Sequence, residues 1–183
     1  MKKKILISIV SVLLVSIVGI VLYGVLVVSK KSPIKTTTYS EAGLDIKVTY
    51  CQPYKKGRLI FGEEKDNALL PYGKYWRLGA NGATEITFNK NVNFAGKPVN
   101  AGSYRMYAVP GPDSFQISLN SELGVYFAVN EPDYALDVVK VNLPVETAPE
   151  TEQLTITFNT DSTGVKMDLI WDTTKITVPI TVQ

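Results

Sequence analysis

Apolar and polar residues alternate along the C-terminal third of the chain, and this alternation restricts the fold more than any other feature. In residues 165–171 every second side chain is apolar: Val165, Met167, Leu169 and Trp171. Side chains of a β-strand point alternately to its two faces, whereas those of an α-helix return to the same face about every 3.6 residues. Residues 165–171 are therefore predicted to form a strand that buries one face.

Similar segments recur between residues 44 and 182, separated by residues typical of turns. About nine strands are expected, at residues 44–50, 84–88, 92–94, 104–109, 115–119, 136–143, 154–158, 165–171 and 176–182. Short helical turns are expected within 63–70 and 131–136. Pro179 favours an edge position for the last strand, because proline lacks the amide hydrogen of a sheet. The pattern predicts one all-β domain over 41–183, built as a two-sheet β-sandwich or jelly roll.

The first 28 residues have a different character. After Met1 and three lysines, the run Ile5–Val28 contains no charged residue. A helix of this length, rising about 1.5 Å per residue, would cross a hydrocarbon core of about 30 Å. A cleaved signal peptide is the alternative, but its apolar region is shorter, about 7–15 residues, and ends in a small-residue cleavage site. Residues 1–28 are therefore expected to be a retained, single-pass membrane anchor, with cleavage left open.

Residues 29–40 are polar, contain one proline and show no periodicity, so a linker is expected between the anchor and the domain. The basic flanks of the apolar run are nearly balanced: Lys2, Lys3 and Lys4 precede it, and Lys30, Lys31 and Lys35 follow it. A very short basic N-terminus before a first apolar segment usually stays inside. The C-terminal domain is therefore expected outside the cytoplasm, at the cell membrane.

Composition excludes several kinds of chemistry. The chain has no histidine and one cysteine, which removes the usual general base, the Ser-His and Cys-His pairs and most transition-metal sites. Without the six lysines of residues 1–35, the chain carries 13 Lys and Arg against 17 Asp and Glu. A mildly acidic domain is not a nucleic-acid partner. No catalytic residue, metal ligand or cofactor is predicted.

Aromatic and polar residues are concentrated in the irregular, glycine-rich segment 58–84. Its candidate ligand-binding residues are Arg58, Tyr72, Trp76, Arg77 and Asn81. Aromatic faces beside arginine and asparagine donors suit a small polar ligand or a sugar. In the alternative interpretation, Trp76 and Tyr72 close one end of the sandwich and one of the arginines pairs with an acid.

Three other features have a chemical and a structural interpretation, and the structural one is preferred for each. Glu63, Glu64 and Glu85 are the acids nearest the aromatic cluster and are candidates for a glycosidase-like carboxylate pair. The segment 161–164 (Asp-Ser-Thr-Gly) is a candidate calcium site or simply a turn. Cys51 is a candidate reactive thiol, with Lys55 and Lys56 nearby in sequence, or a small buried side chain.

Four blocks of the sequence resemble the domain of unknown function 2911 family of bacterial exported proteins, from about residue 44 to the end. They are 48–62 (V-T-Y-C-Q-P…K-G-R-L-I-F-G), 70–84 (L-P-Y-G-K-Y-W-R-L-G-A-N-G-A-T), 100–110 (N-A-G-S-Y…P) and 171–180 (W…K-I-T-V-P-I). The resemblance implies no activity that can be carried over. Cys51, Gln52 and Gly82 depart from the Ser, Arg and Glu of the family pattern, and 63–69 looks longer than usual. A polar site built on those groups would be incomplete here.

Two functional hypotheses of different class follow. The preferred hypothesis is a non-catalytic, extracytoplasmic binding or interaction module for a small polar ligand, a glycan or an envelope protein. The alternative is a carboxylate-based hydrolase that acts on glycans. Two carboxyl groups about 5–9.5 Å apart in an open cleft near Trp76 would favour the hydrolase.

Overall fold

The computed structural model describes residues 2–23, 31–126 and 128–183, and it divides into two compact units, residues 1–33 and 34–183. The first unit contains helix α1 (Lys2–Tyr23). Among the described residues, no helix combines the length and the apolarity needed to cross a membrane. Residues 24–28 of the predicted anchor and residues 29 and 30 of the predicted linker lie outside the described residues. The anchor stays a prediction.

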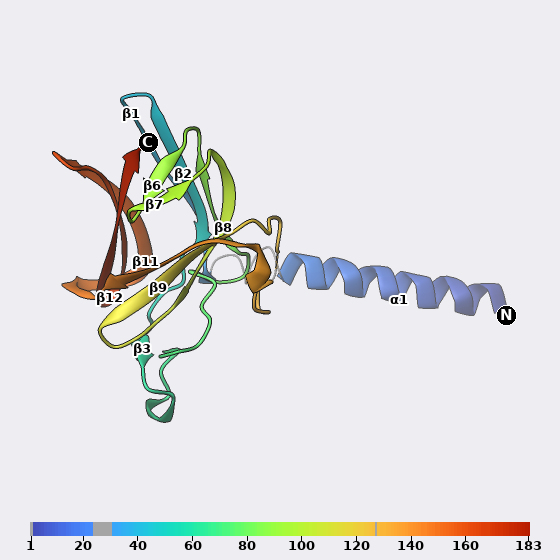
Figure 1. Ribbon diagram of the computed structural model, residues 1–183. Helices are drawn as coiled ribbons and strands as arrows, with labels where there is room; N and C mark the ends of the chain where they lie inside the picture. Colours follow the sequence, from blue (N-terminus) through green and yellow to red (C-terminus); the bar gives the residue numbers. More distant parts are fainter. Residues whose placement is uncertain (1, 24–30, 127) are drawn as a thin grey trace. The chain divides into compact units, whose positions relative to one another are not determined.

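The second unit is all-β, and its larger sheet has six antiparallel strands. In spatial order they are β1 (Ile34–Glu41), β2 (Leu44–Cys51), β5 (Thr84–Phe88), β8 (Gly102–Val109), β9 (Ser114–Asn120) and β10 (Asp137–Pro144). Figure 1 shows these strands facing the second sheet. The predicted β-rich, sandwich-like fold is confirmed.

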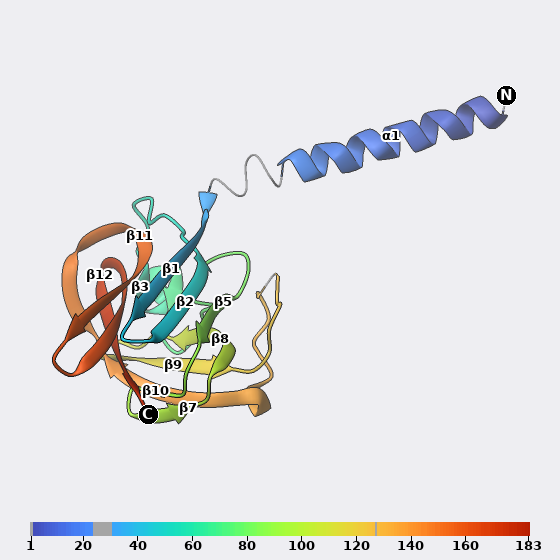
Figure 2. The ribbon, with the colours of Figure 1, turned by 90° about the horizontal axis from the view of Figure 1, so that it is seen from above.

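The second sheet has four antiparallel strands, in the order β11 (Glu146–Asp161), β12 (Gly164–Val182), β6 (Val92–Phe94) and β7 (Lys97–Val99). Figure 2 shows β11 and β12 curving around one side of the larger sheet. The segment after β2 is joined to β11 of the second sheet where Tyr54 pairs with Gln153 and the Leu154 amide donates to the Pro53 carbonyl (3.1 Å).

A short projection leaves the sandwich between β2 and β5. It consists of β3 (Phe61–Gly62), a 3-10 turn η2 (Glu64–Asp66) and β4 (Leu70–Pro71), and β3 and β4 pair in parallel. Figure 1 shows it extending from the bottom of the domain. A second 3-10 turn, η3 (Tyr134–Leu136), precedes β10. Both turns fall within the segments where short helical turns were expected.

The apolar core lies between the two sheets and is built by the alternation seen in the sequence. The inward residues of β2 are fully buried, and those of β12 are nearly so. They are Leu44, Ile46, Val48 and Tyr50 on β2, and Val165, Met167, Leu169 and Trp171 on β12. Burial of such side chains stabilises a fold by about 1.5–3 kcal/mol each before entropy is counted, so this alternation specifies which face turns inward.

The expected boundaries need three corrections. Strand β1 begins at Ile34, inside the predicted linker 29–40, so the all-β unit starts there and not at residue 41. Most of its side chains are exposed on both faces, so no alternation marked it, and its partner β2 follows through a tight turn at Ala42 and Gly43, both with positive φ (51° and 75°).

The second and third corrections concern β7 and β12. No strand was expected between 94 and 104, but Lys97–Val99 form β7, which tolerates Pro98 because it lies at the sheet edge. The two strands expected at 165–171 and 176–182 are one strand, β12, bent at Asp172 (φ 56°). The expected edge position of the last strand is wrong, because β12 lies between β11 and β6. Exposed Pro179 is tolerated because the pairing of β12 with β11 ends at Lys175.

Candidate functional site

Trp76, the central residue of the predicted binding face, is buried in the sandwich. Its side chain is 4 % exposed, stacks on Trp171 (ring centroids 6.0 Å apart) and meets the edge of Phe61 (5.4 Å). Its backbone exchanges two 2.8 Å hydrogen bonds with Ala108 on β8. These contacts agree with the alternative interpretation, in which Trp76 closes one end of the sandwich.

The other four predicted residues do not line a common cavity with Trp76. Arg58 is exposed, and its guanidinium donates to the carbonyls of Tyr54 and Lys55, so it fixes the turn after β2. Tyr72 and Arg77 are half-buried, and Arg77 donates to the carbonyl of Asn81 (3.3 Å). Neither arginine has an acid among its described hydrogen-bond partners. The prediction that the five residues bind a ligand stays untested.

The segment from Arg77 to Asn81 holds an unusual backbone conformation. Leu78 (φ 54°) and Asn81 (φ 58°) are left-handed, which is rare for a branched residue such as leucine. The buried hydroxyl of Thr84 donates to the Leu78 carbonyl (2.7 Å) and holds the turn. A Cβ at Gly79 would come within 2.8 Å of the Cys51 carbonyl oxygen, so this position requires glycine.

A small apolar cavity of about 10 Å³ lies between the sheets at Trp76. Phe61, Phe115 and Trp171 line it together with aliphatic residues and Thr174, and none of the lining residues is acidic. Its size is close to the minimum that holds one water molecule. The buried Trp76 Nε1 has no hydrogen-bond partner, whereas Trp171 Nε1 donates to the Glu152 carbonyl (3.3 Å). The cavity therefore lacks the acids that a hydrolase would need.

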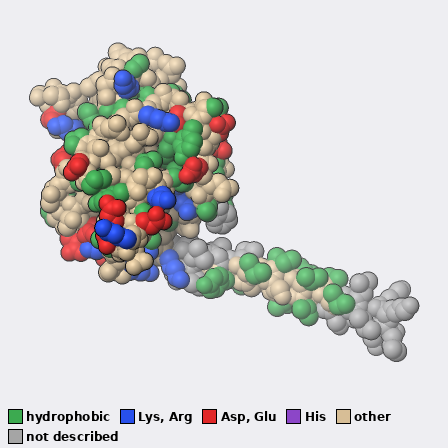
Figure 3. Space-filling view, turned by 60° about the horizontal axis from the view of Figure 1, so that its bottom comes forward, with side chains coloured by type: hydrophobic (Ala, Val, Ile, Leu, Met, Phe, Trp, Pro, Cys, Tyr) green, Lys and Arg blue, Asp and Glu red, His purple; other side chains and the backbone are tan. Residues whose placement is uncertain are grey.

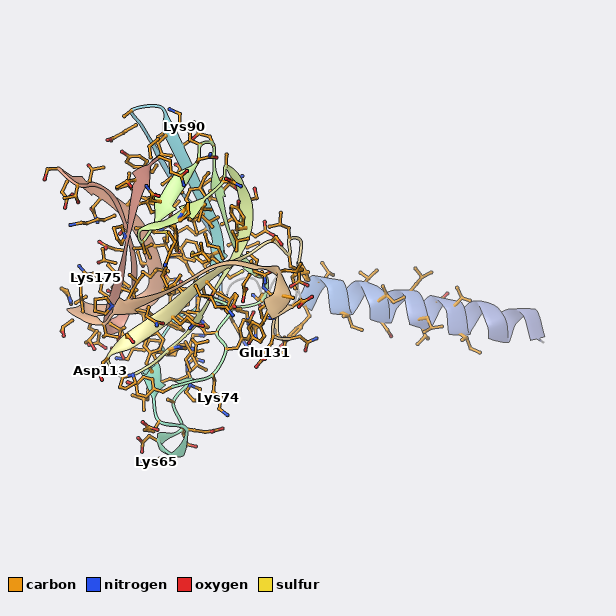
Figure 4. All side chains as sticks on the ribbon, in the orientation of Figure 1. Lys65, Lys74, Lys90, Asp113, Glu131 and Lys175 are labelled. Atoms are coloured by element: carbon orange, nitrogen blue, oxygen red, sulfur yellow. The ribbon has the colours of Figure 1, made fainter. Side chains whose placement is uncertain are left out.

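The three candidate acids lie on different elements. Glu63 and Glu64 belong to the projection and are exposed, and Glu64 pairs with Lys74 at 3.6 Å. Glu85 lies on β5, where its carboxylate accepts the amide of Gly124 (3.0 Å). Figure 4 labels Lys65 at the tip of the projection and Lys74 closer to the sandwich. Glu64 and Glu85 thus each interact with another part of the fold, and the three acids come from different elements.

Cys51 and the segment 161–164 also have structural explanations. Cys51 is buried (7 % exposed) opposite Ile34 at the end of β2. Lys166 and the Thr163 hydroxyl and amide hold the pKa of the Asp161 carboxyl well below its usual range. Within the described residues, no three or more His, Cys, Asp or Glu side chains gather where a metal ion could bind.

A polar cluster on the other face of the larger sheet was not predicted. We call the face turned away from the core the outer face, and the outer polar cluster comprises Tyr75, Arg105, Tyr107, Ser118, Asn120, Glu122 and Asp137. Arg105, Tyr107, Ser118 and Asn120 are at most 1 % exposed. Since β8 and β9 also bury their inward side chains against the core, the middle of this sheet is covered on both faces.

Arg105 is the centre of the outer polar cluster. It forms an ion pair with Glu122 through Nη1, and Nη2 donates to the Tyr75 hydroxyl (2.6 Å) and to the Asn130 carbonyl (3.1 Å). Its guanidinium also lies 5.7 Å from the centre of the Tyr75 ring. A buried guanidinium is tolerated only with such partners, because burying an unpaired charge is costly. Arg105 thereby ties three chain segments together.

Asn120 and Asp137 form the second half of the cluster. The Asn120 side-chain amide donates to Asp137 (2.8 Å) and to the Asp133 carbonyl (2.9 Å), and its oxygen accepts the Glu122 amide (2.8 Å). The Tyr107 hydroxyl donates to Asp137 (2.7 Å). Burial, together with the nearby Asp137 carboxylate, raises the pKa of Tyr107 above its ordinary value. The neutral phenol is therefore the stable form at neutral pH.

These hydrogen bonds fix the loop 121–136 across the outer face. The Ala83 amide donates to the Val125 carbonyl (3.0 Å), and the Ala128 amide donates to the Asn81 carbonyl (3.2 Å). The Ala128 carbonyl accepts a hydrogen bond from the Tyr75 hydroxyl (3.2 Å). Ala128 is fully buried. The described part of the loop is therefore anchored at both ends and in its middle, to β5, to the turn at Asn81 and to β8.

The fixed loop and the start of β10 nevertheless expose large apolar side chains. We call this set the apolar loop surface: Leu123 (47 % exposed), Val129 (63 %), Leu136 (42 %) and Val138 (45 %). Figure 4 labels Glu131 on the same loop. Elsewhere, on the face drawn in Figure 3, basic and acidic side chains are interspersed and no single charge dominates. Exposed apolar side chains grouped on one loop are typical of an interaction surface.

Comparison with known proteins identifies the family. No match was found among curated proteins or among solved structures. A family model described as "Protein of unknown function (DUF2911)" matches residues 32–180, which includes every strand from β1 to β11 and nearly all of β12. The match confirms the resemblance drawn from the sequence blocks. The chain belongs to this family of proteins of unknown function, DUF2911.

Proposed function

We propose that this protein is a membrane-anchored binding module on the outer side of the cell membrane, and that the apolar loop surface is its binding face. The observation that carries the proposal is the combination of a loop fixed by buried hydrogen bonds with apolar side chains that it leaves exposed. Binding residues usually lie on loops held by a rigid scaffold. Residues 5–28 supply the anchor in this proposal.

Catalysis is less well supported than binding. The aromatic cavity at Trp76 is lined by no acid, and Glu64 and Glu85 each have a structural partner. A carboxylate-based hydrolase needs two carboxyl groups that face one another across a substrate. A glycan hydrolase therefore has no observation in its favour, and the proposal concerns binding alone.

The anchor is tested on the full chain in its native membrane. We expect the chain to remain with the membranes after a high-salt wash, and protease added to spheroplasts to degrade the β domain. A mature N-terminus near residue 29 would contradict the retained anchor. Complete protection of the domain would contradict the outward orientation.

The binding face is tested by a matched pair of neighbours on β10. Val138 is 45 % exposed, whereas Val139 is 6 % exposed and packs in the core. Val138→Ser is expected to change the free energy of unfolding by less than about 0.5 kcal/mol, and Val139→Ser to lower it by about 2 kcal/mol. Denaturant unfolding of both variants compares them. Equal losses would mean that Val138 serves the fold, and the proposed face would lose its basis.

A further inference from the structure

The middle of the loop 121–136 reaches across the outer face toward β1, where the chain enters the domain, whereas Leu136 and Val138 lie at β10 on the opposite edge of the sheet. Ile34, the first residue of β1, pairs with Cys51, and the Cys51 backbone is in contact with Gly79. Two residues on, the Asn81 carbonyl accepts the amide of Ala128 from the loop. These contacts form a continuous series. It runs from the start of β1 to the end of β2, then to the turn at Asn81 and to the loop.

Ile34 faces the same way as the loop. On β1 the side chains of Thr37 and Tyr39 turn inward, where Thr37 bonds to the Ile156 carbonyl and Tyr39 meets Phe158, so Ile34 belongs to the outward-facing set. Ile34 is 74 % exposed. The outer face thus carries exposed apolar side chains both at the entry of the chain and on the loop.

The length of chain before β1 limits how far this face can lie from a bilayer. Val28 ends the apolar run and Ile34 begins β1, so only residues 29–33 lie between them. A fully extended chain spans at most about 3.6 Å per residue, so the six steps from Val28 to Ile34 reach no further than about 22 Å. With the proposed anchor in a bilayer, this length is the greatest distance that could separate Ile34 from the end of the apolar run.

The acids beside the apolar loop surface are already engaged within the protein. Glu122 pairs with Arg105, Glu131 accepts the Tyr134 hydroxyl (3.0 Å) and Asp133 accepts the Ala135 amide (3.0 Å). Among the described residues near η3, Lys140 pairs with Asp137 and lies 5.1 Å from the centre of the Tyr134 ring, whereas Lys31 and Lys35 flank Ile34 in the sequence. The loop itself therefore favours contact through its apolar side chains over contact with a strongly anionic partner.

We propose that the apolar loop surface and Ile34 rest on the lipid bilayer that holds the anchor, with their side chains at the headgroup–acyl boundary. The inference rests on the proposed membrane anchor and deepens it by naming a lipid surface as the occupant of the binding face. Interfacial apolar side chains bury about 5–10 Å into this boundary. The contact holds the β domain in one orientation on the membrane.

A fluorescent label on the loop tests the contact in the full chain. Cys51, the single cysteine, is replaced by serine, and an environment-sensitive dye is attached to Val129→Cys. The matched control is Ser162→Cys in the exposed hairpin between β11 and β12. That hairpin lies in the other sheet, beyond the Tyr39–Phe158 contact at the far end of β1. Both proteins are reconstituted into phosphatidylcholine vesicles with and without nitroxide-labelled lipid.

The expected result is at least about twofold stronger quenching by nitroxide lipid at position 129 than at position 162, since only the loop reaches the boundary. Raising the salt from about 0.1 to 1 M shortens the screening length from about 10 to 3 Å and is expected to leave the quenching unchanged. Loss of the contrast in an Ile34→Ser, Leu123→Ser variant would support the apolar origin of the contact.

Three other outcomes would overturn the inference. Equal quenching at the two positions means that the loop does not touch lipid. The label could instead be shielded from both nitroxide lipid and aqueous iodide, to an extent that rises with the protein-to-lipid ratio. That result would show that the face binds a second copy of the chain. Quenching that vanishes in high salt assigns the contact to charge. Failure of the chain to float with vesicles would instead refute the anchor, so the two failures are distinguishable.

Discussion

The two faces of strand β8 bury side chains of opposite chemistry. Tyr104, Met106 and Ala108 point into the apolar core between the sheets, while Arg105 and Tyr107 point outward into the outer polar cluster. The inward face is covered by the second sheet, but the outer face is covered by the loop 121–136. Apolar packing is non-directional, whereas a hydrogen bond needs its donor and acceptor at a set distance and angle. The hydrogen bonds of the outer polar cluster therefore fix the loop more specifically than apolar packing would.

The comparison predicts the largest loss of stability on the apolar side. Trp76→Ala removes a ring that stacks on Trp171 and touches Phe61, and it enlarges an existing cavity. The free energy of unfolding is expected to fall by about 3–5 kcal/mol in chemical denaturation. Trp76→Phe, which keeps most of the volume, serves as the control and is expected to lose clearly less. A loss below about 1 kcal/mol would contradict a core position for Trp76.

A smaller loss is expected on the polar side. Arg105→Met keeps the length of the side chain but leaves the Tyr75 hydroxyl and the Asn130 carbonyl without their donor. Stability is expected to fall by about 2–3 kcal/mol, because buried polar groups are then unpaired. Glu122→Gln is the milder control, since the Glu122 side chain is 38 % exposed and water can replace part of the interaction. Equal effects of the two changes would contradict the central position of Arg105.

The smallest effect depends on pH and concerns Tyr107. Burial raises the pKa of Tyr107, so the folded state favours the neutral phenol. The contribution of the neutral phenol to folding stability is fully present below the ordinary tyrosine pKa of about 10, and it is lost as the pH rises above that value. Tyr107→Phe removes the ionisable group. The stability difference between the native chain and this variant is therefore expected to shift in favour of the variant between pH 9 and 11, by at most about 1.4 kcal/mol per pH unit. Identical pH slopes in denaturant unfolding would contradict a buried neutral phenol.

The sequence predicts the inward face of the fold well, because burial on that face follows the two-residue period of a strand. Strands β5 and β6 begin and end where expected, and the inward residues of β12 are buried. Strand β1 was missed because an edge strand exposed on both faces shows no period. Strand β12 was predicted as two strands because a bend at Asp172 interrupts the alternation of apolar and polar residues without ending the strand.

The outer polar cluster was beyond reach from the sequence for a different reason. Arg105 and Asn120 look like ordinary outward residues of strands, and what buries them is a loop whose residues show no periodicity. Two sequence signals indicate that the loop covers the outer face. Residues Tyr104–Val109 are apolar on both faces apart from Arg105. The apolar residues Leu123 and Val129 lie in a loop, where solvated residues are usually polar. The glycine and aromatic residues near Trp76 proved to shape a strained turn and fill the core.

Amide hydrogen exchange in the full chain tests most directly whether the loop 121–136 is a fixed part of the fold. The amides of Ala83 and Ala128 join the loop to the turn at Asn81 and to the residue before β5, and the amide of Ala108 reports the core of β8. We predict that Ala83 and Ala128 exchange within about tenfold of Ala108, and that Arg105→Met accelerates the first two far more than the third. Exchange of Ala128 at the rate of an unprotected amide would contradict the account, because a loop that opens freely cannot display a permanent apolar surface.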